Sequence, residues 1–526
     1  MLLGTLITLL FSSCLTNLAW ANDEDPNSVD LLNTADAAIQ WKKQTASLSH
    51  DEQLLASAST EAAESGSRAN DWLALALGRL GYPDDYAAYR ALIESNVARL
   101  YADERNLSTT NPTDWHRSGI AVLSLGGDPA TLTAQSTSFI ADGTYYREGL
   151  QPLRAQGTSA YIWGLILLDS LRYEIPAEAN LDRDALITHL LEMQESDGGF
   201  GFGNSSSADL TGMALQALAP YYNSEQVYAY TRSSDGAALE GSARNAVDRA
   251  LAYLSDTQQP NGGFGKESGA YCESVAQAII GLCSLGISPT KDERFIKEGN
   301  TLVGALLSYV QEDGGFSHEL DGDSPGGVTG GGNASSGNIV SSPIATDQAL
   351  LSLAALVRQQ EGARTLYDFR IEQDAALKAQ IAQLEEEIAG LATAESSAYS
   401  DHIQSLLSKY LTIPVGERSY VANYTVLSDA LAARGLENNS EWLAGSMGEN
   451  SSGNGYVLDL YGLAGVTAGE RLADAGNDSQ GSKAQDSPLP LNGIIAAGAV
   501  VALLAVLVII IMRKRKAGGS NAKQIK

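Results

Sequence analysis

Apolar residues recur along the chain in six compact segments, each of them apolar on nearly every face. Every segment begins with a small or acidic polar residue and is followed by a glycine or proline. Helices that are apolar all round are buried, whereas a helix with one polar face lies at a surface. The pattern therefore predicts six buried helices, and these start at Asp71, Asp114, Thr158, Asp209, Glu273 and Asp347.

A second helical stretch precedes each buried segment, as at residues 243–258 and 295–311. The first of these is amphipathic, with Arg244, Asp248 and Arg249 on its polar face, so it belongs on the outside. Six buried helices that alternate with six outer ones predict an all-α fold, a closed (α/α)6 toroid. All the buried helices would then begin at one face of the ring. An open helical solenoid shows the same pattern and remains an alternative.

One short phrase recurs three times, each time between an outer stretch and the next buried one. Its Asp/Asn-Gly-Gly step predicts a sharp turn, because glycine tolerates positive φ angles. The phenylalanine that follows is expected to fill the gap between helices. The three copies are QESDGGF from Gln194, QQPNGGF from Gln258 and QEDGGF from Gln311.

These phrases, the D/E-x-x-x-A-L-x-x-L helices after them and the count of six resemble a known family. They look like the prenyltransferase and squalene-oxidase repeat of terpenoid-cyclase toroids, over about residues 30–370. Within it, the likeness is strongest to bacterial surface proteins related to the α-domain of cobalamin-binding transport proteins. The resemblance implies a fold rather than an activity, because the same toroid serves cyclases, protein prenyltransferases, thioester domains and vitamin carriers.

Beyond the toroid, which we assign to residues 22–370, the pattern changes. A short heptad stripe and further helices up to residue 436 predict a coiled-coil or helical stalk module at 371–437. Residues 438–493 are rich in Gly, Ser, Asn and Asp and predict a flexible linker, with a short ordered piece at 456–463. The stripe consists of the apolar residues Leu377, Ile381, Leu384, Ile388 and Leu391.

Both ends of the chain predict membrane targeting. Residues 1–21 have an apolar run and a small-x-small ending at Ala19–Ala21, which is typical of a secretory signal peptide; Cys14 leaves a lipoprotein signal as an alternative. Residues 494–512 carry no charge and would cover about 28 Å as a helix, enough to span a bilayer. The basic tail at 513–526 is expected in the cytoplasm. The sequence therefore predicts a single-pass cell-membrane protein, bacterial by its resemblance, with its N-terminal domain outside.

The net charge and the cysteine content indicate which partners and which covalent links to expect. The 526-residue chain has a net charge of −29, and an acidic surface repels nucleic acid, so we expect no nucleic-acid partner. After removal of the signal, Cys272 and Cys283 remain. Eleven positions apart on one helix, they would lie about 16 Å apart, too far for a disulfide. Both thiols are therefore expected to be free.

The starts of the buried helices supply the candidate ligand-binding residues. Acidic residues occupy five of the six starts, where they would ring the mouth of one cavity, although first-turn acids also stabilise helices without binding anything. Aromatic residues nearby would suit a flat or apolar ligand, or simply pack the core. The segment 321–343, just before the last buried helix, would hang over this mouth as a flap. The candidates are Asp71, Trp72, Asp114, Trp115, His116, Tyr161, Trp163, Asp209, Tyr271, Glu273 and Asp347.

Catalytic patterns of the resembling families are incomplete here. Cys272 and Glu273 lie at the fifth start, but no histidine accompanies Asp347 at the sixth, which leaves a poor zinc set. No Asp-rich acid motif of the cyclase type occurs, and Val275 stands where a thioester would need glutamine. We therefore assign no catalytic residue, metal or cofactor, and whether the protein is an enzyme stays open.

The sequence thus favours a membrane-anchored extracellular protein that binds a small molecule in the toroid. The resemblance to cobalamin carriers makes a corrinoid the first ligand to test, although those carriers use a second, β-rich domain that has no counterpart here. Two alternatives remain: a structural or adhesive surface protein, and an enzyme of the terpenoid-cyclase or prenyltransferase class.

Overall fold

The computed structural model describes the chain in ten stretches, and the fold below refers to these alone. The predicted signal peptide at 1–21, the membrane segment at 494–512 and the basic tail lie outside them, as do residues 321–338 of the predicted flap. Within the described stretches, no helix combines the length and the apolar character needed to cross a membrane. The stretches are residues 25–55, 70–104, 111–132, 139–147, 149–203, 205–266, 269–320, 339–393, 399–436 and 455–465.

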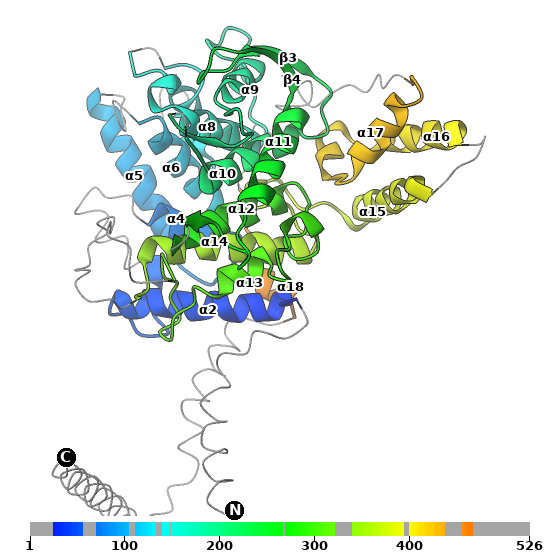
Figure 1. The fold of residues 1–526 in the computed structure, drawn as a ribbon. Helices are drawn as coiled ribbons and strands as arrows, with labels where there is room; N and C mark the ends of the chain where they lie inside the picture. Colours follow the sequence, from blue (N-terminus) through cyan, green and yellow to red (C-terminus); the bar gives the residue numbers. More distant parts are fainter. Residues whose placement is uncertain are drawn as a thin grey trace, which may run out of the picture. The chain divides into compact units, whose positions relative to one another are not determined.

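Six helices of the described chain form an inner ring, as the apolar segments predict (Figure 1). Each packs on the next, and the last returns to the first, so the ring is closed and the open solenoid is excluded. The last helix starts one turn before the predicted Asp347, because Ser342 caps it and Pro343 occupies its first position. The inner helices are α4 (Asp71–Leu80), α6 (Thr113–Ser124), α8 (Thr158–Ser170), α10 (Ala208–Leu218), α12 (Cys272–Ser284) and α14 (Pro343–Gln360).

The outer layer consists of helices that pack against the ring, and most of those whose burial is described leave one face exposed. In α11, the buried residues are Ala243, Ala246, Val247, Ala250, Leu251 and Leu254, at the spacing of a helical stripe. The first outer helix, α2, packs on α14 and so joins the beginning of the toroid to its end. The outer helices are α2 (Ser28–Thr45), α5 (Tyr86–Glu104), α7 (Phe139–Gly143), α9 (Arg183–Glu192), α11 (Ala243–Thr257) and α13 (Leu302–Leu307).

The repeated phrase forms the predicted turn in all three copies. Its first glycine has a φ of 91° at Gly198, 85° at Gly262 and 89° at Gly314. A Cβ atom at these positions would lie 2.5–2.8 Å from a backbone oxygen of the next outer element, which is α2 in the third copy. The following phenylalanines are buried. Each turn therefore attaches one outer element to the next, and the third attaches α13 to α2.

Short β-hairpins interrupt the predicted all-helical fold, which is therefore mostly rather than purely helical. In the described residues they follow two of the three repeated phrases and α10. The longest is antiparallel, with Tyr228 opposite Gly241 and Tyr230 opposite Leu239. The strands are β1 (Phe200–Phe202) with β2 (Ser205–Ser207), β3 (Val227–Thr231) with β4 (Ala238–Ser242), and β5 (Gly265–Lys266) with β6 (Gly269–Ala270). Short 3₁₀ turns are η1 (Pro129–Thr131), η2 (Leu153–Gln156), η3 (Ala219–Tyr221), η4 (Glu293–Phe295), η5 (Gly390–Thr393) and η6 (Val415–Tyr420).

The segment after the ring folds into a small helical unit, which we call the helical module (residues 374–436). It contains α15 (Ala375–Ala389), α16 (Tyr399–Thr412) and α17 (Tyr424–Ala432). The heptad stripe of α15 packs inside this module, in one apolar cluster with Ile403, Leu406, Leu427 and Leu431. The stripe therefore builds an intramolecular core rather than a seam for a second chain.

Several contacts join the later segments to the ring, and two of them are described here. The Glu417 carboxylate of the helical module accepts hydrogen bonds from Arg364 and Arg370, which follow α14. Farther on, residues 455–465 with α18 (Leu460–Leu463) pack back onto the toroid, and Tyr461 Oη donates to Asp36 Oδ1 of α2 at 2.7 Å. The sequence predicts an ordered piece at 456–463 within the linker, in this stretch.

Candidate functional site

Three of the candidate carboxylates gather where neighbouring inner helices begin, an end of the ring that we call the N-terminal rim. Arg117 of α6 joins two of them, with Nε 3.2 Å from Asp71 Oδ2 and Nη2 3.2 Å from Asp114 Oδ1. Asp347 of α14 pairs with Lys42 of α2 at 2.6 Å. Burial raises the Asp347 pKa, and the Lys42 charge opposes this. Each carboxylate is thus already engaged by a protein cation.

The two remaining carboxylates occupy the first turns of α10 and α12. Glu273 Oε2 lies 2.7 Å from His318 Nδ1, and the imidazole stacks on Tyr271 with ring centroids 5.0 Å apart. The Glu273 hydrogen bond raises the His318 pKa, more than burial lowers it. Asp209 is half-buried in the first turn of α10. Neither acid is an N-cap, because the preceding residues hold that position, so both act as first-turn acids.

Trp72 and Trp163 meet across the axis of the ring, since they belong to α4 and α8, which have α6 between them. Their ring centroids are 4.9 Å apart. Tyr367, from the segment after α14, adds an edge contact to Trp163 at 5.7 Å. These three aromatic side chains fill the centre of the ring between its two ends.

Trp115, His116 and Tyr161 point outward instead, which corrects the expectation that they line a central cavity. Trp115 Nε1 donates to Tyr101 Oη of α5 at 2.7 Å. The His116 ring lies 2.8 Å from the Gly143 carbonyl oxygen, and burial lowers its pKa to about 3. Tyr161 stacks on His189 of α9. All three side chains hold the inner and outer layers together.

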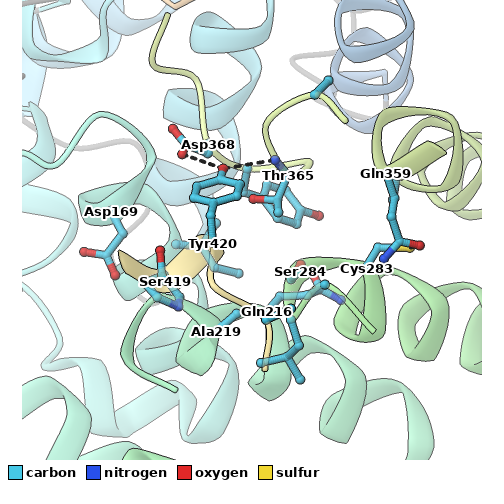
Figure 2. A pocket seen from close by; sticks show the side chains of 18 of the residues that line it. Asp169, Gln216, Ala219, Cys283, Ser284, Gln359, Thr365, Asp368, Ser419 and Tyr420 are labelled. Carbon is cyan, nitrogen blue, oxygen red and sulfur yellow. Dashed lines mark hydrogen bonds between the residues drawn. The ribbon is translucent and has the colours of Figure 1, made fainter. Parts of the chain in front are cut away.

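A cavity of about 310 Å³ lies at the opposite end of the ring, where inner helices finish (Figure 2). We call it the C-terminal cavity. Its walls come from the last turns of α8, α10, α12 and α14, from residues 362–370 and from η6 of the helical module. It is a junction between the ring and the module, so residues far apart in the sequence meet there.

Gln216, which lines the C-terminal cavity, begins a row of glutamines that joins three inner helices. Gln216 Nε2 of α10 donates to Gln277 Oε1 of α12 at 2.8 Å, and Gln277 Nε2 donates to Gln348 Oε1 of α14. Gln216 Oε1 and Tyr367 Oη are both buried, and neither has a hydrogen-bond partner within the described stretches. Buried polar atoms normally have partners, and both of these atoms belong to residues that line the hollow.

One wall of the C-terminal cavity is ionic. Tyr420 Oη donates to Asp368 Oδ2 at 2.8 Å and accepts the Thr365 backbone N–H at 3.2 Å (Figure 2). Burial opposes ionisation of Asp368, but the Arg370 and Arg364 guanidinium groups outweigh it and hold the pKa of that carboxyl well below its usual range. This wall is therefore a fully charged and rigid structure at neutral pH.

The other side is more apolar and contains no reactive thiol. Ile166, Ala217, Leu285 and Ala355 line it, together with Cys283. Burial raises the pKa of the Cys283 thiol, so it stays protonated. Cys272 is a buried free thiol too, as expected from the sequence. Across the described residues, no group of three or more His, Cys, Asp or Glu is placed to hold a metal ion.

These features define a mostly helical α/α toroid with a hollow lined by side chains at one end. Residues 137–363 match the family model of the prenyltransferase alpha-alpha toroid domain, so the chain contains a domain of that family, as its repeats suggest. The match includes α8, α10, α12 and α14, the helices that end at the C-terminal cavity. Comparisons with curated proteins and with solved structures gave no significant match.

The residues of the C-terminal cavity are absent from the sequence-based candidates. Those candidates were chosen at helix starts, whereas Gln216, Ser284 and Gln359 lie near helix ends. The charged run from Arg364 to Arg370, just after the last apolar helix, was the available signal. The role of this charged run in the cavity depends on the helical module, whose position cannot be predicted from the sequence.

Proposed function

We propose that this protein binds a small molecule in the C-terminal cavity of its toroid. The observation that carries the proposal is the pair of buried polar atoms, Gln216 Oε1 and Tyr367 Oη, that have no partner in the described chain and belong to residues lining this hollow. A bound ligand that donates to one and accepts from the other would remove an unfavourable burial of about 1–3 kcal/mol for each. A cavity used only for packing gains nothing from such atoms.

The volume of the cavity limits the ligand. About 310 Å³ lies at the lower end of the range of ~300–1,000 Å³ that small-molecule sites occupy. A corrinoid is too large for this space, so the ligand proposed here is a smaller amphipathic molecule. A corrinoid would need the N-terminal rim instead. An absorbance shift of cobalamin or cobinamide on mixing with the protein would contradict the assignment to the C-terminal cavity.

We also propose that the toroid is held outside the cell by the predicted membrane segment at 494–512. The uncharged length of that segment and the basic residues after it support this. Protease added to intact cells should remove the toroid and leave a short membrane-bound remnant. A toroid that stays protected until the cells are lysed would contradict the proposed orientation.

The binding proposal is tested by filling the cavity. Ser284 lies on its wall, and its Oγ donates to the carbonyl oxygen four residues earlier at 2.8 Å. Ser408 of α16 makes the same bond at 2.9 Å but is exposed, which makes it a matched control. In calorimetric titrations of the full chain in lipid nanodiscs, with empty nanodiscs as blank, hexan-1-ol should bind the original protein and Ser408→Trp equally. Ser284→Trp should weaken binding at least about tenfold, equivalent to ~1.4 kcal/mol.

Equal binding by both tryptophan variants would overturn the proposal, and so would the failure of hexan-1-ol and of its charged analogues to bind. Unfolding by urea, followed for both variants, identifies any loss caused by misfolding. One observation favours a second candidate, a structural surface protein: Trp72, Trp163 and Tyr367 pack the centre of the ring. That candidate predicts no binding of any probe at either end.

A further inference from the structure

Arg172 stands out among the residues that line the C-terminal cavity. It follows the end of α8, and only 4% of it is exposed to solvent. Its backbone has a φ of 58°, in the left-handed region that few residues other than glycine adopt. Such a conformation costs of order 1 kcal/mol or more and persists where the surroundings enforce it. The fold therefore holds an arginine side chain at this wall at an energetic cost.

The guanidinium group of Arg172 has no hydrogen-bond or ion-pair partner within the part of the chain that the structure describes. Nearby carboxylates attract the Arg172 charge but form no hydrogen bond or ion pair with it in the described residues, because each is already bound by other groups. Asp169 is bound by Arg183 and Tyr221, and Asp368 and Glu417 are both bound by Arg364 and Arg370. Glu385, on the same cavity, accepts the Ala422 backbone N–H.

This buried side chain has five N–H donors and remains a cation. Burial and the neighbouring Arg370 charge lower the Arg172 pKa to about 10, so the group is protonated at neutral pH. The C-terminal ends of the inner helices favour positive charge at this end of the ring, which helps to explain why arginines are tolerated here. A helix dipole supplies no acceptor in the plane of a guanidinium, however. The N–H donors of Arg172 therefore still require a hydrogen-bond acceptor.

The helical module packs closely against the Arg172 guanidinium group. A Cβ atom at Gly416 of η6 would lie 1.5 Å from Arg172 Nη1, so only glycine leaves room for the observed position. Gly416 thereby allows the backbone of the module to approach the guanidinium directly. The arginine is thus confined between the end of α8, η6 and the hollow.

We infer that the C-terminal cavity recognises a small amphipathic carboxylate, whose carboxylate group pairs with Arg172 and whose apolar body lies on Ile166, Leu285 and Ala355. This inference rests on the proposed binding function and adds the chemical class of the ligand. A carboxylate matches the planar, forked donors of arginine with two parallel hydrogen bonds. Asp368 and Glu417 lie near Arg172 but are already paired with Arg364 and Arg370, so they leave the Arg172 donors for a ligand.

The test compares hexanoate with hexan-1-ol and hexylamine, which differ in head group alone. The protein is the full chain in nanodiscs, with empty nanodiscs as blank. We expect hexanoate to bind tightest and hexylamine weakest. Arg172→Asn removes the cation without a backbone penalty, because asparagine tolerates the left-handed region. It should weaken hexanoate binding about tenfold to a hundredfold, the range of a charged hydrogen bond, and change hexan-1-ol binding by less than about twofold.

Two controls separate the possible failures. Arg294→Asn removes an equally charged but half-exposed arginine, paired with Asp292, and should leave both affinities unchanged. Arg172→Lys keeps the charge but loses the fork and should fall between the original protein and Arg172→Asn. If hexan-1-ol binds and hexanoate binds no better, or Arg172→Asn leaves hexanoate binding intact, the carboxylate inference is wrong and the binding function stands. If no probe binds, the proposed function itself fails.

Discussion

The two ends of the ring are built in different ways. At the N-terminal rim, the repeated turns place glycines such as Gly198 and Gly262 against the next outer element, and the acids of the helix starts pair locally with Arg117, Lys42 and His318. At the other end, the last turns of inner helices form part of the C-terminal cavity, but its ionic wall comes from residues after the repeats, the segment 364–370 and η6.

This difference separates fold from function. A repeat reproduces the same backbone geometry in each copy, so it makes the ring but gives every helix start the same chemistry. A specific site needs side chains that occur once, and Arg172, Asp368 and Tyr420 are of that kind. In this protein they meet where the helical module covers the ring.

Removing one partner of the ionic wall should have the largest effect on stability. Asp368 is buried and accepts hydrogen bonds from Arg370, Arg364 and Tyr420, so Asp368→Asn leaves two buried guanidinium groups without full compensation. Breaking a buried pair of this kind costs about 3–5 kcal/mol. Urea unfolding should show this loss.

The matched change at the N-terminal rim is Asp114→Asn. The Asp114 side chain is 20% exposed and Arg117 keeps Asp71 as a partner, so the expected loss is about 1 kcal/mol or less. Equal losses in the two variants would remove the contrast between the ends of the ring.

The fold was largely predictable, because helices that are apolar all round are unmistakable and the three turns mark the repeat. For the same reason, the sequence does not show which face of each helix points into the ring. In α8 both faces are apolar, so nothing in the sequence distinguishes the inward Trp163 from the outward Tyr161. The cavity was not predictable, because it depends on where residues 415–422 lie in space. The β3 strand was predictable and missed, because its sequence VYAYT is rich in residues that favour strands.

A glycine of the repeated turn should come next in effect. Gly262 has a φ of 85°, and a Cβ there would lie 2.5 Å from the Thr301 carbonyl oxygen. Gly262→Ala must therefore bear both strain and a backbone collision, which we expect to cost about 2–3 kcal/mol. Gly203→Ala is the control, since Gly203 has a φ of 65° and open space around it; strain alone should cost about 1 kcal/mol. A difference of zero between the two in urea unfolding would show that the turn does not attach the outer elements.

The two ends should also respond to pH in opposite directions. The Asp368 pKa is lowered on folding, so this carboxylate contributes stability above its unfolded pKa of about 4, and the contribution is lost as the pH falls through the lower folded value. The His318 pKa is raised on folding, so its contribution is complete below about pH 6.5 and is lost as the pH rises through the folded value. Stability should therefore fall at acid pH because Asp368, at the C-terminal cavity, becomes protonated. It should also fall as the pH rises past neutrality because His318, at the N-terminal rim, loses its proton.

The smallest expected effect belongs to His318. Its side chain is 45% exposed, so solvent screening should keep its pairing with Glu273 below about 1 kcal/mol. His318→Asn should flatten the change in unfolding free energy between about pH 6 and 8. Asp368→Asn should leave that change intact and flatten the loss of stability on the acid side. If Asp368→Asn flattened the change between about pH 6 and 8 as well, the two ends of the ring would be energetically coupled and would not act separately.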